Sequence, residues 1–83
     1  MLKHKHMITI CVDVEHHLKM QRFVDDNVKT IGGISNYIDD RKSYTTFETT
    51  VDIATIANEL QLLNRNETSY FTATIMGSLI IVN

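Results

Sequence analysis

The feature that most constrains the fold of this chain is the order in which two residue periodicities follow one another. From Met7 to Val14, β-branched residues alternate with Met, Thr, Cys and Asp, a pattern typical of a half-buried strand. From Glu15 to Ile31, apolar residues recur at helical spacing with no glycine or proline between them. The sequence therefore predicts a strand and then a helix of about four turns, which ends at Gly32 and Gly33 because glycine favours a left-handed helix stop.

The next segment predicts two strands joined by a polar turn. Ile34–Ile38 alternates apolar and polar residues, and Ser43–Val51 is rich in threonine and aromatic residues, which suit a pleated surface. Asp39–Lys42, between them, is entirely polar. We therefore predict a β-hairpin over residues 34–51.

The last third of the chain predicts a second helix and a final β region. Asp52 is a good N-cap, and the helical apolar stripe that follows it reaches Leu63. Ser69–Val82 alternates again, although Gly77 and Ser78 interrupt it. The interruption fits either a bulge in one long bent strand or the turn of a terminal hairpin, and we favour the long strand.

The predicted element order is β-α-β-β-α-β. Two right-handed crossovers in this order give a ferredoxin-like α+β sandwich, an antiparallel sheet with two helices on one face. We expect a single domain over residues 1–83, with residues 1–6 as a flexible N-terminal extension. Six residues are predicted to meet in the core between sheet and helices: Ile10, Val12, Phe47, Ile56, Leu60 and Ile75.

Chain length and cysteine content limit how such a domain is stabilised. With 83 residues and one cysteine, the chain forms no internal disulfide and no four-cysteine zinc site. Small cores without these supports are often stabilised by self-association. The longest apolar run, residues 73–82, is about half the ~20 residues of a membrane-spanning helix, and no apolar signal-peptide region follows the basic N-terminus. We therefore expect a cytoplasmic protein with no membrane segment.

The strand parity opposite to the predicted core defines an open face of the sheet. This face is predicted to carry Thr, Tyr and Met side chains, and tyrosine and methionine are enriched at protein interfaces. An ordinary solvated face and a stacking platform for nucleic-acid bases are the alternatives. The residues predicted to bind a partner, on this face or in the C-terminal strand, are Tyr44, Thr46, Tyr70, Thr72, Met76, Leu79, Ile80 and Val82.

Charge disfavours a nucleic-acid partner. Residues 1–42 hold seven lysines and arginines against six carboxylates, and residues 43–83 hold one arginine against four carboxylates. The second half, which supplies most of the open face, therefore has a charge of −3 and would repel phosphate. An RNA-binding module is kept as the alternative function.

No constellation of reactive side chains predicts an enzyme or a metal site. His4 and His6 belong to the expected flexible terminus, and the adjacent His16 and His17 point about 100° apart on a helix, which does not suit one shared ion. Cys11 has no second cysteine. We therefore expect no catalytic residue, no metal and no cofactor, and a small hydrolase is only the third function considered.

By elimination, the sequence predicts a protein-binding module that acts as a small regulator, inhibitor or accessory subunit. The frequent Ile, Thr and Asn (10, 10 and 6 residues) resemble the usage of small accessory proteins, including those of bacteriophages. A homodimer, or a contact with a different protein chain, is also predicted, in which Met76–Val82 crosses to the neighbouring chain. This segment has no charge or proline to block edge pairing, and its last four residues are expected to extend unpaired beyond the sheet.

Overall fold

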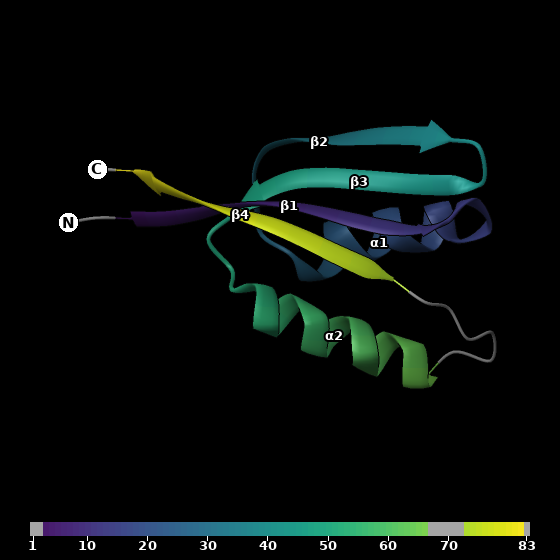
Figure 1. The fold of residues 1–83 in the computed structure, drawn as a ribbon. Helices are drawn as coiled ribbons and strands as arrows, with labels where there is room; N and C mark the ends of the chain where they lie inside the picture. The colour runs from purple at the N-terminus through teal and green to yellow at the C-terminus, as the bar shows by residue number, and fades with distance from the viewer. Residues whose placement is uncertain (1–2, 67–72, 83) are drawn as a thin grey trace.

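The computed structural model describes residues 3–66 and 73–82 and shows one four-stranded antiparallel sheet with both α-helices on one face (Figure 1). The strand order is β2-β3-β1-β4, so β1 and β3 are central and β2 and β4 form the edges. This arrangement is the predicted ferredoxin-like α+β fold. The elements, in chain order, are β1 (Lys3–Asp13), the short 3₁₀ helix η1 (Val14–His16), α1 (His17–Asn27), β2 (Thr30–Asp39), β3 (Lys42–Thr49), α2 (Ile53–Asn66) and β4 (Thr74–Val82).

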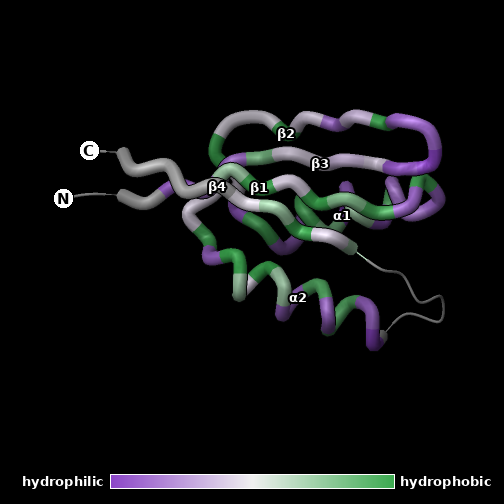
Figure 2. Tube along the Cα trace, in the orientation of Figure 1, coloured by the Kyte–Doolittle hydropathy of each residue, from purple (hydrophilic) through white to green (hydrophobic). Residues whose placement is uncertain are grey.

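The core lies between the sheet and the helices, as the alternation predicts. Ile8, Ile10 and Val12 of β1 are buried beneath α1 and α2, and five of the six predicted core residues are buried. The sixth, Ile75, is half-buried and packs against the same cluster. Figure 2 shows the corresponding hydropathy, with hydrophobic positions along β1 and a hydrophilic turn between β2 and β3.

Strand β1 begins earlier than the sequence predicted. Residues 3–6 belong to β1 and pair with Leu79–Val82 of β4, so the prediction of a flexible extension over residues 1–6 is wrong for residues 3–6. The same pairing corrects the expectation that the last four residues of the chain's β region extend unpaired, because β1 hydrogen-bonds them on one side. Residues 1–2 lie outside the described residues.

The first helix is shorter than predicted. It ends at Asn27, whose side-chain amide donates to the Phe23 carbonyl, and Val28 has the extended backbone that leads into β2. Thr30 and Ile31 pair with Thr49 and Glu48 of β3, so these β-branched residues form sheet and not helix.

Gly32 and Gly33 therefore are not the helix stop that the sequence predicted. They lie within β2, where the register with β3 jumps between Ile31 and Ser35, and Gly32 has a φ of 78°. Extra β2 residues are accommodated there, which makes the segment a bulge in an edge strand. A left-handed φ is the reason glycine suits that position.

The hairpin turn, the second helix and the final strand follow the sequence prediction, although β2 begins at Thr30 and not at the predicted Ile34. Asp40 and Arg41 form the turn between β2 and β3, with Asp40 at a φ of 57°. The Asp52 carbonyl accepts the Ile56 amide at 3.1 Å, as expected for the residue at the N-cap of α2. Gly77 pairs with Ile8 inside an uninterrupted β4, so the long strand is confirmed and the terminal hairpin is excluded. The bulge expected at Gly77 and Ser78 is wrong, because the register with β1 continues through both residues without a shift. Residues 67–72, where the sequence placed the start of this β region, lie outside the described residues.

Candidate protein-binding face

The face of the sheet opposite the helices is a continuous surface built from all four strands. Register places Met7, Thr9 and Cys11 of β1 beside Glu48, Thr46 and Tyr44 of β3, with Ser78, Met76 and Thr74 of β4 on the other side of β1. Beyond β3, Ser35 and Tyr37 of β2 continue the same rows. We call the described residues whose parity turns them away from the helices the open face.

The open face exposes several large apolar side chains. Met7, Ile31, Tyr37 and Met76 are between 41 and 62 % exposed, and each comes from β1, β2 or β4. Methionine is exposed on the central strand β1 and on the adjacent edge strand β4, while isoleucine and tyrosine are exposed on the other edge strand, β2, beyond β3. Exposed apolar side chains that share one sheet face mark a candidate interaction site. Methionine adapts its shape to different contacts, which suits a binding surface.

The polar groups between these side chains are ordered by contacts with one another. The Thr9 and Thr46 hydroxyls hydrogen-bond at 2.9 Å across β1 and β3, and the Tyr37 and Tyr44 rings lie 6.0 Å apart, tilted by 39°. The Lys5 ammonium lies 3.0 Å from the Glu48 carboxylate, which balances the charge at one end of the face. Cross-strand pairs of this kind stabilise the sheet and order the side chains of the open face.

Tyr44 keeps its hydroxyl protonated at neutral pH. The pKa of Tyr44 lies above its ordinary value of 10.0. The largest cause is electrostatic repulsion from the adjacent Cys11, and burial adds to it. The side chain therefore presents an apolar ring and a neutral hydroxyl that can donate or accept a hydrogen bond.

A shallow hollow of about 280 Å³ opens where the β2 bulge meets the open face. Its lining includes Met7, Ile31, Thr46 and the two bulge glycines. Neither glycine has another atom within 4 Å of the position that a Cβ would occupy, so the bulge leaves bare backbone facing open space. The hollow gives the open face a concave feature beside its exposed apolar side chains.

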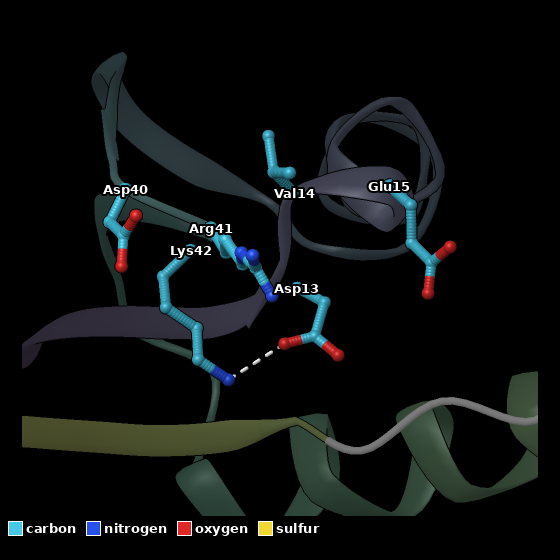
Figure 3. Close-up of a pocket in the computed structure, with 6 residues that line it drawn as sticks. All are labelled: Asp13, Val14, Glu15, Asp40, Arg41 and Lys42. Carbon is cyan, nitrogen blue, oxygen red and sulfur yellow. Dashed lines mark hydrogen bonds and ion pairs between the residues drawn. The ribbon is translucent and has the colours of Figure 1, made fainter.

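A second hollow, of about 510 Å³, lies at the end of β1 and the β2–β3 turn (Figure 3). It is lined by Asp13, Val14, Glu15, Asp40, Arg41 and Lys42. Lys42 donates to Asp13 at 2.7 Å, an ion pair that lowers the pKa of Asp13 and raises the pKa of Lys42. With three carboxylates against two cations, one of which is already paired, this hollow is not suited to hold a phosphate.

Among the residues whose side chains the structure describes, the candidate reactive residues do not converge on a site. His17 Nδ1 lies 2.6 Å from the Ser43 hydroxyl, while His16 is buried with its Nε2 atom 3.4 Å from Glu15. Over residues 3–66 and 73–82, no group of three or more His, Cys, Asp or Glu side chains is arranged to hold a metal ion. In the same part of the chain, no helix is long and apolar enough to cross a membrane.

The structure places the predicted partner-binding residues in three groups. Tyr44, Thr46 and Met76 lie on the open face, as predicted. Leu79, Ile80 and Val82 lie in β4, paired with residues 3–6 of β1. Tyr70 and Thr72 lie outside the described residues.

Sequence reasoning missed Ile31 and Tyr37 as members of the open face. Ile31 was assigned to the apolar stripe of the first helix, which was wrong because the helix ends four residues earlier. Tyr37 alternates with Ile34 and Ile38 along the predicted strand, so the sequence alone could have placed Tyr37 on the opposite face of the sheet.

A ferredoxin-like α+β domain with an uncovered sheet face is the class of protein that the fold defines. Searches against protein-family models and against curated proteins give no match. Among solved structures, the chain is similar to a PII-like signaling protein from Thermus thermophilus, with 12 % identity, a TM-score of 0.59, and coverage of 98 % of this chain and 91 % of the other.

Two structures of CPII, a nitrogen regulatory PII-like protein from Thiomonas intermedia, are also similar. The apo form has 12 % identity, a TM-score of 0.58, and coverage of 100 % of this chain and 98 % of the other. The form bound to ADP, AMP and acetate has 13 % identity, a TM-score of 0.55, and coverage of 96 % and 91 %. At these identities the likeness is one of fold, and it extends over nearly the whole chain.

Proposed function

We propose that this chain is a small cytoplasmic regulatory protein that works by binding other protein chains, through its open face and its C-terminal strand. The observation that carries the proposal is the exposure of Met7, Ile31, Tyr37 and Met76 together on the sheet face that, within residues 3–66 and 73–82, has no helix over it. The fold likeness to PII-like proteins, whose names describe signaling and nitrogen regulation, supports a regulatory role. No catalytic step is part of the proposal.

Self-association is the second part of the proposal. β4 is an edge strand, and its residues carry no charge and no proline. Edge strands of this composition pair readily with another strand. We therefore propose a homodimer in addition to a protein partner bound at the open face.

Nucleotide binding is not part of the proposal, although one similar structure is bound to ADP and AMP. The hollow at the end of β1 combines Arg41 and Lys42 with Asp13, Glu15 and Asp40. Its carboxylates outnumber its cations, which disfavours a phosphate. RNA binding stays the alternative because Tyr37 and Tyr44 are neighbours on the open face, where aromatic rings can stack with bases.

A pull-down comparing two matched variants tests the open face. Met7→Lys places a charge on the open face, and Leu62→Lys places the same charge at a comparably exposed position, 50 % against 41 %, on α2. The wild type and Leu62→Lys should capture the same partner from a cell lysate, and Met7→Lys should lose it. Equal capture by both variants would contradict the proposal, and loss of the partner on nuclease treatment would favour the RNA alternative.

A further inference from the structure

At one end of the sheet, the paired strands β1 and β4 extend beyond β3. β3 pairs with β1 only as far as His6, while β4 continues to pair with β1 through Lys5, His4 and Lys3. Residues 3–5 and 80–82 therefore form a two-stranded arm with no third strand in the part of the chain that the structure describes. Figure 1 shows this arm projecting past both helices and past β2 and β3.

A two-stranded antiparallel ribbon is marginally stable when nothing covers it. In this chain, neither α1 nor α2 lies beneath the arm (Figure 1). The β4 side of the arm is Ile80, Ile81 and Val82, a strongly apolar sequence. In the part of the chain that the structure describes, the arm therefore combines an apolar strand with no third strand beside it and no helix beneath it.

The two edges of the sheet are not equally able to accept another strand. β2 carries the bulge between Ile31 and Ser35 and the left-handed Gly32, which interrupt its edge, and it ends on Asp39. Bulges and charges are the devices that block edge pairing. β4 runs for nine residues with no register shift, no charge and no proline, so among the described residues it is the edge that can accept another strand.

We infer that two copies of this chain pair through β4, antiparallel, with Ser78 on the two-fold axis. This inference deepens the self-association part of the proposed function and rests on it. With Ser78 on the axis, each of the nine residues of β4 lies opposite a residue of the partner's β4. Residues that lie opposite each other then face the same side of the sheet, so both faces continue from one copy to the other. The matched positions are Thr74 with Val82, Ile75 with Ile81, Met76 with Ile80, and Gly77 with Leu79.

This register also supplies the arm with the elements that it lacks. The first half of the partner strand, residues 74–77, would lie beside residues 79–82 and become the third strand of the arm. Helix α2 begins next to Gly77, where Ile53 contacts the sheet, and it runs along β4 toward Thr74 (Figure 1). The second copy's α2 would therefore lie beneath the arm of the first copy, and the reverse would hold by symmetry.

The strand that pairs with β4 comes from a second copy of this chain, because in such a pair the uncharged β4 of each copy extends the sheet of the other. An unrelated strand would pair with β4 equally well through its backbone, but it would not bring a helix to the helix side of the arm. The two α2 helices start near the axis and run away from it, so they do not compete for one place. Pairing of identical segments about an axis is the usual form of a protein dimer.

Cysteine cross-linking tests both the dimer and its register. In a Cys11→Ser background, Ser78→Cys places two sulfurs opposite each other on the axis, at a Cα separation of about 4.5–5.5 Å that a disulfide can span. Oxidation should then convert the protein to a covalent dimer. Met76→Cys is the matched control; it should stay uncross-linked until Ile80→Cys is added, because those two positions face each other.

The oligomeric state and hydrogen exchange provide measurements that do not depend on the cysteine variants. The wild type should sediment as a dimer at about 100 μM, and Ile80→Lys should give monomers. Amide protection in residues 74–82 should fall when the wild type is diluted, while protection in β3 should not.

The possible failures separate this inference from the proposed function. A wild type that is monomeric at about 100 μM would overturn the dimer and leave binding of another protein at the open face to the pull-down test. A dimer that cross-links through Thr46→Cys but not through Ser78→Cys would overturn the β4 pairing, while it would support association through the open face.

Discussion

Gly77 lies at a close approach of α2 to the sheet, and a methyl group added there tests the packing of these two elements. A Cβ at this position would overlap Ile53 Cδ1 and lie 3.3 Å from Ile53 Cγ1. Ile53 is half-buried and packs against the core, so its side chain cannot turn away without losing contacts. Overpacking of this kind costs about 1–3 kcal/mol.

An opposing contribution comes from the unfolded chain. Replacing glycine by alanine at an unstrained position stabilises a protein by about 0.4–1 kcal/mol, because the unfolded state loses conformational freedom. Gly77 has no left-handed φ, so this contribution applies. Taking the middle of each range, the expected net loss of unfolding free energy for Gly77→Ala is about 1.3 kcal/mol, which lowers Tm by roughly 5–10 °C in a domain of this size.

Ile53→Ala removes both atoms that the new methyl group would meet. In that background, Gly77→Ala should be neutral or stabilising by up to about 1 kcal/mol. Urea denaturation of the wild type, the two single variants and the double variant, all at one protein concentration, measures this coupling. An equal cost of Gly77→Ala in both backgrounds would refute the assigned contact between Ile53 and β4.

Three further predictions concern the core, an ion pair and metal binding. Leu60→Ala should lower the unfolding free energy by about 2–5 kcal/mol, because Leu60 is buried between α2 and the sheet; an unchanged Tm would show that the α2 stripe is misassigned. The pKa of Asp13 is lowered from 3.8 by the hydrogen bond and charge of Lys42, so the stabilisation is present above pH 3.8 and is lost as the pH falls through the lower folded-state pKa. Acid titration followed by circular dichroism should therefore show the advantage of wild type over Asp13→Asn shrinking toward low pH, and a difference that does not depend on pH would contradict the pairing. Zinc or nickel in modest excess should leave Tm unchanged; a shift that grows with metal concentration and disappears in His16→Ala or His17→Ala would overturn that expectation.

The sequence by itself determined the order of the elements and, within the strand segments that it predicted in β1, β3 and β4, which side of the sheet the residues face. The alternation of Ile8, Ile10 and Val12 with polar or smaller residues predicts a strand that is buried on one face of the sheet only, and all three residues are buried. This local pattern holds in any α+β arrangement of the chain. The same alternation placed Tyr44, Thr46 and Met76 on the open face. These assignments were correct because the side-chain period of a strand is fixed by its backbone.

Tertiary structure decided where the strands begin, and the sequence pattern did not reveal it. Thr30 and Ile31 continue a helical stripe in the sequence, but pairing with Thr49 and Glu48 of β3 gives their backbone groups partners in the sheet. Gly32 and Gly33 therefore lie in a bulge of β2 and do not end the first helix. The polar, histidine-rich segment before Met7 has no strand pattern of its own; it is a strand because β4, from the opposite end of the chain, supplies its hydrogen-bond partners.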